Sequence, residues 1–209
     1  MFIETRGNDG VKPNKVPFSF AILNPSASFG GLYVPENLPK IDTAFLESAS
    51  KKSYKEITLD ILKLFNIDIE EEVMKKAVAL YDAFDDAKEP TPLSQIEDDL
   101  FVNELYHGPT RAFKDMALSI LPHLLVTSAR KINVKNEIVI LTATSGDTGK
   151  AALAGFADVP GTKIIVFYPK SGVSPIQEKQ MVTQKGDNTY VIGIKGNFDD
   201  AQTGVKKMF

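Results

Sequence analysis

Three apolar segments, separated by stretches of helical periodicity, constrain the fold of this chain more than any other feature. They are EIVILTA, TKIIVFY and NTYVIGI, and all lie between residues 137 and 194. Strands that alternate with helices predict a parallel sheet, because a parallel pair needs a crossover and the crossover is usually a helix. We therefore predict an α/β fold with a doubly wound, mainly parallel sheet, which binds ligands beyond the carboxyl ends of its strands.

A helical region precedes this sheet. Apolar residues recur at helical spacing between residues 42 and 86, and we interpret this stripe as a packed core face. Prolines and a glycine pair before residue 40 predict an extended, turn-rich lead-in. The break EPTPL at residues 89–93 suggests a boundary. We predict a largely helical domain over residues 1–90 and an α/β domain over residues 91–209.

Several helix ends can be located from capping residues. Ser174 followed by Pro175 is the preferred start of a helix, and Asn197 with Asp200 three residues later predicts another. A long amphipathic helix is predicted from about residue 111 to residue 130, with Thr110 as its N-cap. No glycine or proline closes the last helix, so we expect the chain to stop in mid-helix as part of a longer protein.

Composition excludes several functional classes. The net charge of −3, with both signs interspersed, gives no basic stripe for nucleic acid. The chain has no cysteine and only two histidines, so disulfides, thiolate chemistry and a metal site are not expected. No apolar run approaches the ~18 residues that span a bilayer, and no signal pattern opens the chain. We expect a cytoplasmic protein with a small-molecule substrate and no membrane partner.

The segment YHGPTRAFKDMAL contains the first candidate for chemistry. It places Lys114 in the first turn of the predicted helix. The helix dipole destabilises an ammonium group there, and lysines activated in this way form Schiff bases. From position alone, a solvated lysine that pairs with Asp115 or another neighbour is the better explanation, so this position does not establish the chemistry.

The segment LTATSGDTGKAAL contains the second candidate. Ser145, Gly146, Asp147 and Thr148 follow a strand and open a helix, where backbone N–H groups suit a carboxylate or phosphate. A nucleotide-binding P-loop is excluded, because Thr144 and Ala151 replace two of its fixed residues. The alternative is that the glycines only turn the chain tightly between strand and helix.

Together these segments resemble threonine synthase. The resemblance rests on SFAILNPSASFGGLYVPENLP, HGPTRAFKDMAL, ATSGDTGKAAL and YPKSGVSPIQEKQMVTQKG, in the order of that family, and it continues into IKGNFDDAQTGVKKMF. It implies the β-family fold of enzymes that use pyridoxal 5′-phosphate (PLP), similar to the tryptophan synthase β subunit. It also implies that residues 91–209 are an incomplete PLP-binding domain, with the cradle for the cofactor phosphate beyond Phe209.

The resemblance implies a reaction and roles for residues. The reaction is O-phospho-L-homoserine plus water to L-threonine plus phosphate, the last step of threonine biosynthesis. Lys114 would hold PLP and act as acid and base, and the cofactor-binding turn would comprise residues 145–148. Thr144, Ser145, Thr148 and Arg111 are candidates for binding substrate. The 209 residues alone are expected to turn over little, and the oligomeric state does not follow from the sequence.

Two positions depart from the family pattern, and two other functions remain open. Arg111 stands where leucine is usual, and either acts on Lys114 or the substrate phosphate, or is a solvated arginine. Phe29 stands where aspartate is usual, and we interpret it as local packing. The first alternative function is a threonine synthase-like phospho-lyase that eliminates phosphate without making threonine. The second is a non-catalytic module of the same ancestry.

Overall fold

The computed structural model describes residues 1–7, 15–24, 26–27 and 30–208. Pro13, Pro25 and Phe29, which the sequence interpretation used, lie outside these residues. The chain divides into two compact units. The first comprises Met1–Ala79 with His123–Lys135, and the second comprises Leu80–Pro122 with Asn136–Phe209.

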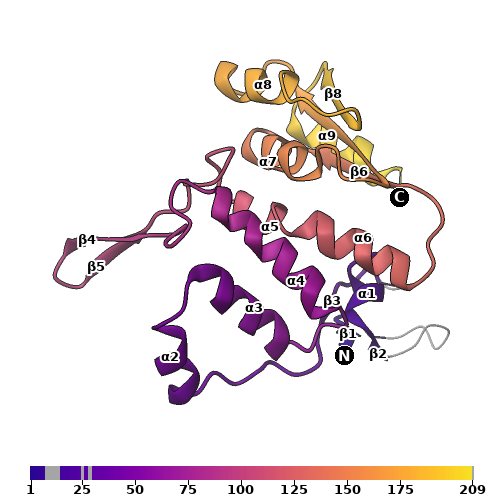
Figure 1. The fold of residues 1–209 in the computed structure, drawn as a ribbon. Coiled ribbons are helices and arrows are strands. Elements are labelled where there is room, and N and C mark those ends of the chain that lie inside the picture. The colour runs from indigo at the N-terminus through magenta and orange to yellow at the C-terminus, as the bar shows by residue number, and fades with distance from the viewer. Residues whose placement is uncertain (8–14, 25, 28–29, 209) are drawn as a thin grey trace. The chain divides into compact units, whose positions relative to one another are not determined.

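The first unit combines a small sheet with short helices (Figure 1). Strand β1 (Phe2–Glu4) pairs in antiparallel fashion with β2 (Lys15–Val16) on one side and β3 (Tyr33–Pro35) on the other. The predicted lead-in is therefore extended, but the sequence did not reveal its sheet. The helices of this unit are α1 (Phe18–Ala21), α2 (Thr43–Ala49), α3 (Tyr54–Leu64), α4 (Glu71–Val78) and most of α6 (Leu121–Lys131). The helical prediction for residues 42–86 is confirmed.

Asp68 connects distant parts of the first unit. Its carboxylate accepts hydrogen bonds from Ser19, at 2.8 Å from the backbone N–H and 2.7 Å from the hydroxyl. It also pairs with Lys131 of α6 at 2.9 Å. These contacts tie α6 to α1, which explains why the unit includes residues from beyond the boundary predicted at residue 90. The two divisions differ, and the predicted domain boundary stays a prediction.

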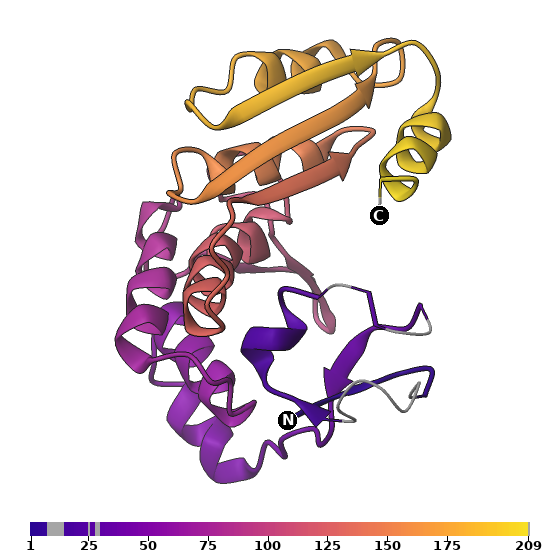
Figure 2. The ribbon, with the colours of Figure 1, turned by 90° about the vertical axis from the view of Figure 1, so that its right-hand side faces the viewer.

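The second unit contains the predicted parallel sheet. Strands β6 (Ile138–Ala143), β7 (Thr162–Pro169) and β8 (Thr189–Ile194) are parallel and lie in the order β6-β7-β8. Helices α7 (Asp147–Phe156) and α8 (Pro175–Val182) lie along one side. Helix α9 (Phe198–Lys206) contacts β6 and β7 from the other side, and Figure 2 shows it in yellow beyond the arrowheads of these strands. The doubly wound prediction is confirmed.

Apolar side chains on one face of β7 form the core of this sheet. Ile164 and Val166 are fully buried, together with Leu153 of α7 and Met181 of α8. Ser174 caps α8 and Asn197 caps α9, each in a capping box, as the sequence predicts. Helix α9 ends at Lys206, two residues before the last described residue, so the expectation that the chain stops in mid-helix is not met within the described residues.

Two further features of the second unit differ from the sequence prediction. Strands β4 (Leu93–Glu97) and β5 (Leu100–Asn103) form an antiparallel hairpin that was not foreseen, and the 3₁₀ helix η1 (Ala79–Ala83) crosses the division between the units. The long helix predicted over residues 111–130 is instead α5 (Asp115–Leu118) followed by α6. No helix among the described residues is long and apolar enough to cross a bilayer.

Candidate active site

The turn between β6 and α7 is organised by one hydroxyl group. Thr144 is buried, and its Oγ1 accepts hydrogen bonds from the N–H groups of Gly146 and Gly149, each at 3.0 Å. It also donates to the carbonyl of Gly146 at 3.1 Å. A Cβ on Gly149 would lie 2.4 Å from Thr144 Cγ2, so only glycine allows this close packing. Thr144 therefore shapes the turn from inside.

The same turn leaves two backbone donors open at the start of α7. The N–H groups of Asp147 and Thr148 lie in the first helical turn, where a helix offers no acceptor, and no other described residue accepts from them. They lie beyond the carboxyl end of β6, at the edge where ligands bind in open α/β sheets. This arrangement suits an anion.

The carboxylate of Asp147 is held toward α8. Its Oδ1 accepts a hydrogen bond from Gln177 Nε2 at 2.9 Å and lies 3.5 Å from Lys150 Nζ. Gln177 also closes the capping box of α8 with Ser174. The starts of α7 and α8 are therefore joined through one glutamine side chain.

Lys114 directly precedes α5 rather than lying within a long helix. It is half-buried and takes the N-cap position, and its Nζ lies 4.9 Å from the centroid of the Phe113 ring. Within the described part of the chain, Lys114 forms no ion pair. The alternative in which Lys114 pairs with Asp115 is wrong, because the Asp115 carboxylate is turned inward.

The Asp115 carboxylate binds the HGPT segment, residues 107–110, to the start of α5. It accepts hydrogen bonds from the Thr110 N–H at 2.8 Å and the Thr110 hydroxyl at 2.6 Å, and Asp115 is 2% exposed. Arg111 follows with a φ of 62°. A side chain that binds the backbone in this way competes with helix formation. The predicted N-cap at Thr110 is therefore wrong, and the helix begins at Asp115.

Replacing Asp115 by alanine is expected to lower the free energy of unfolding by about 2 kcal/mol, because two buried donors of Thr110 lose their acceptor. Replacing it by asparagine should cost much less. The asparagine carbonyl can still accept from the N–H, and its amide can donate to the hydroxyl. Urea unfolding measures both values, and equal losses for the two variants would contradict this account.

Helix α5 packs directly against α7. A Cβ on Gly155 of α7 would lie 2.3 Å from the carbonyl oxygen of Leu118, the last residue of α5. The backbones of the two helices thus meet at this point. The segment that contains Lys114 and the helix that begins at the Thr144–Thr148 turn are therefore held together within the second unit.

Arg111 belongs to a separate polar cluster. Its guanidinium pairs with Asp85, and the same carboxylate contacts His107 Nδ1 at 3.3 Å. His107 Nε2 lies 2.8 Å from Glu104, which also accepts a hydrogen bond from Ser94. The hydrogen bonds from Ser94 and His107 lower the pKa of Glu104 to about 2. The hydrogen bond to Glu104 raises the pKa of His107 above its usual range.

The pKa of His107 is expected to lie above 6.5, the ordinary value for histidine, and to fall in Glu104→Gln. A histidine whose pKa is higher in the folded than in the unfolded protein stabilises the fold at pH values below its unfolded-state pKa. This stabilisation is lost as the pH rises through the folded-state pKa. The lowered pKa of Glu104 stabilises the fold at pH values above the ordinary pKa of a glutamate. This stabilisation is lost as the pH falls toward 2. NMR titration of the ring protons measures the shift, with His123 as internal control because only burial lowers its pKa. A His107 midpoint at or below 6.5 in the unmodified chain would show that the cluster is absent.

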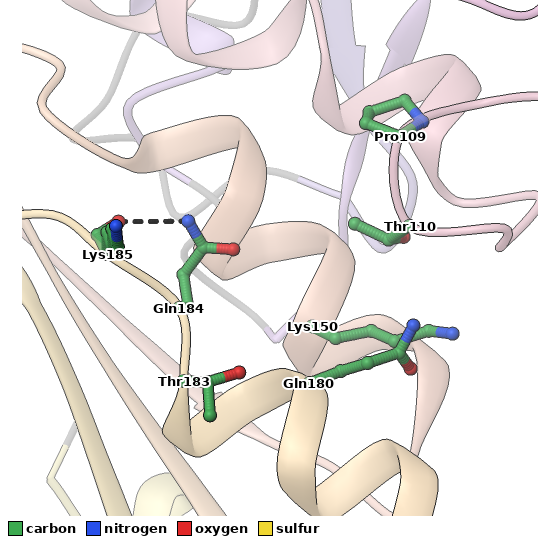
Figure 3. Close-up of a pocket in the computed structure, with 7 residues that line it drawn as sticks. All are labelled: Pro109, Thr110, Lys150, Gln180, Thr183, Gln184 and Lys185. Atoms are coloured by element: carbon green, nitrogen blue, oxygen red, sulfur yellow. Dashed lines mark hydrogen bonds between the residues drawn. The ribbon is translucent and has the colours of Figure 1, made fainter.

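A cavity of about 390 Å³ lies between the Pro109–Thr110 segment, α7 and α8 (Figure 3). Its walls are the Pro109–Thr110 segment, Lys150 of α7, Gln180 of α8, and residues 183–185 after α8. The side chain of Lys150 is 8% exposed. No role for Lys150 was predicted from the sequence. Helix α8, whose Gln180 also lines the cavity, contacts α7, and the sequence gives no direct signal of this packing. Neither Lys114 nor residues 145–148 line this cavity.

Known proteins are similar to this chain in sequence and in fold. The family model described as "Threonine synthase N terminus" matches residues 1–80. Threonine synthase from Pseudomonas aeruginosa is 39% identical over 211 residues, which is 100% of this chain and 43% of that protein. Threonine synthase from Schizosaccharomyces pombe is 35% identical over 217 residues, 100% of this chain and 41% of that protein. This chain is similar to the threonine synthases over its whole length.

The structural comparison extends over the same residues. PLP-bound threonine synthase from Brucella melitensis matches with a TM-score of 0.89 and 35% identity, over 100% of this chain and 44% of that one. The α/β fold with its parallel sheet is therefore the fold found in this part of threonine synthases. The chain spans less than half the length of the threonine synthases to which it is similar.

Proposed function

We propose that this chain supplies the reactive lysine and the anion-binding turn of a PLP-dependent threonine synthase, a lyase of amino-acid biosynthesis. The reaction is the conversion of O-phospho-L-homoserine and water to L-threonine and phosphate. The observation that carries the proposal is the similarity over the whole chain, in sequence and in fold, to a threonine synthase whose structure contains PLP. A cytoplasmic location stays a prediction of the sequence.

The residues present fit this cofactor. Lys114 is half-buried and not committed to an ion pair with any described residue, so its amine can be used for chemistry. The open N–H groups of Asp147 and Thr148 can bind an anionic group of cofactor or substrate. When bound, PLP withdraws electrons from the substrate carbons and makes their protons removable. Lys114 would hold the cofactor, and Ser145, Gly146, Asp147 and Thr148 would border it.

The side chains of this chain would then bind the substrate and transfer protons. The amine of Lys114, once free, moves protons to and from the substrate carbons as general base and acid. Ser145 and Thr148 provide hydroxyls for the substrate carboxylate. Thr144 is better assigned to positioning, because its hydroxyl already holds the turn. Arg111 can reach a substrate phosphate only by leaving Asp85.

Product analysis tests the proposed reaction. A catalytically active form of the protein is incubated with PLP and O-phospho-L-homoserine, and threonine, 2-oxobutyrate and phosphate are quantified. The proposal requires threonine and phosphate in equal amounts. Phosphate with 2-oxobutyrate but no threonine would identify a phospho-lyase instead. The same assay on the 209-residue chain tests the expectation that these residues alone turn over little.

A further inference from the structure

We propose that the cavity beside Lys150 is a second anion site, which binds inorganic phosphate or the phosphate group of a small phosphomonoester. The site is separate from the proposed reaction centre, because its walls include neither Lys114 nor residues 145–148. Its volume of about 390 Å³ lies within the range of small-molecule sites. The proposal does not depend on PLP or on the proposed reaction.

Lys150 provides the charge that the site needs. Its side chain is 8% exposed, and the residue lines the cavity. The nearest carboxylate is that of Asp147 at 3.5 Å, which is too long for a good hydrogen bond and already accepts one from Gln177. An ammonium group has three donors, and no described residue accepts a hydrogen bond from them. A buried cation with free donors is stabilised by an anion.

Gln180 adds a second unsatisfied group to the same wall. Its Oε1 is buried and has no hydrogen-bond partner within the part of the chain that the structure describes. Figure 3 shows its side chain extending in the same direction as that of Lys150. An unpaired buried carbonyl requires a donor. A ligand with acceptors for Lys150 and a hydroxyl would satisfy both groups once the Gln180 amide turns its covered oxygen toward the cavity.

The remaining polar groups of the cavity wall narrow the choice of ligand further. The hydroxyl protons of Thr110 and Thr183 are committed, to Asp115 and to the carbonyl of Lys179 respectively. Besides the side-chain amides of Gln180 and Gln184, the donors for an anion are Lys150 and Lys185, an exposed residue of the wall. Hydrogen phosphate has oxygens for the ammonium groups and a P–OH for Gln180. Sulfate has similar size and charge but no proton to donate near neutral pH.

The test is an NMR titration of the ¹⁵N-labelled chain with phosphate, sulfate and O-phospho-L-serine at constant ionic strength set with chloride. Phosphate should shift the amide signals around Lys150 and Gln180 and bind more tightly than sulfate. Lys150→Met should weaken phosphate binding about tenfold or more, since it removes a charge-assisted hydrogen bond. Lys179→Met, which removes an exposed lysine of the same helix as Gln180, should leave binding unchanged.

Gln180→Met provides a second variant if Lys150→Met does not fold. It keeps the side-chain volume and should remove the preference for phosphate over sulfate while leaving some anion binding. O-Phospho-L-serine distinguishes a site for phosphomonoesters from one for free phosphate, according to which binds more tightly. The proposal is overturned if no shifts centre on the cavity. It is also overturned if Lys150→Met and Lys179→Met weaken binding equally, because the anions would then respond only to net charge.

Discussion

Lys114→Ala is expected to reduce threonine formation by a catalytically active form of the protein at least ~10³-fold. The variant loses the amine that would hold the cofactor and move protons, and positioned acid–base groups alone contribute ~10²–10⁴-fold. The fold should persist, because Lys114 forms no ion pair within the described residues and its ring contact is with the exposed Phe113. Steady-state assays of threonine and phosphate measure the effect.

The control for this variant is Lys179→Ala, which removes an exposed lysine from α8. It should retain the activity of the unmodified protein. Circular dichroism should give the same unfolding midpoint for Lys114→Ala as for the unmodified protein. Retention of a tenth or more of the activity by Lys114→Ala would rule out its proposed role.

Gly155→Ala is expected to lower the free energy of unfolding by about 3 kcal/mol, at the upper end of the range for overpacking. The added Cβ would lie 2.3 Å from the carbonyl oxygen of Leu118 and 3.0 Å from its carbonyl carbon. Both are backbone atoms, so no side-chain rotation relieves the contact. Helix α5 must move away from α7, which also disturbs the position of Lys114. Urea unfolding measures the loss.

Gly204→Ala is the matched control. Gly204 lies in α9 of the same unit, and a Cβ there would meet no atom of the described residues within 4 Å, apart from its chain neighbours and the backbone of its own helix. Alanine is favoured over glycine in a helix by up to about 1 kcal/mol, so this variant should be slightly more stable than the unmodified chain. If both variants changed stability by the same amount, direct contact of α5 with α7 would not be the cause.

Local sequence patterns were sufficient to predict the parallel sheet and the starts of two helices. The three apolar segments became β6, β7 and β8, because each is a short apolar run bounded by turn residues. Ser174 and Asn197 cap their helices as expected, since capping depends on residues three apart in sequence. The hairpin at residues 93–103 was missed, although LSQIE and LFVN flank the polar pair Asp98-Asp99.

The candidate site shows why local sequence patterns predicted only some of its features. Periodicity after Thr110 favours a helix, but the Asp115 carboxylate binds that residue's backbone and delays the helix. The turn after β6 was located correctly, yet the commitment of the Thr144 hydroxyl to two N–H groups is a matter of three-dimensional geometry. The contact of α8 with α7, the helix that contains the buried Lys150, could not be read from one segment.

Chemical trapping tests the central claim most directly, that Lys114 is the residue that holds PLP. The purified chain is mixed with PLP and reduced with borohydride, which makes the lysine bond permanent, and the modified peptides are quantified by mass spectrometry. We predict that Lys114 is modified far more than the exposed Lys179, and that this preference disappears when the chain is unfolded in urea. Modification spread over the exposed lysines, with Lys114 no higher than the rest, would contradict the assignment.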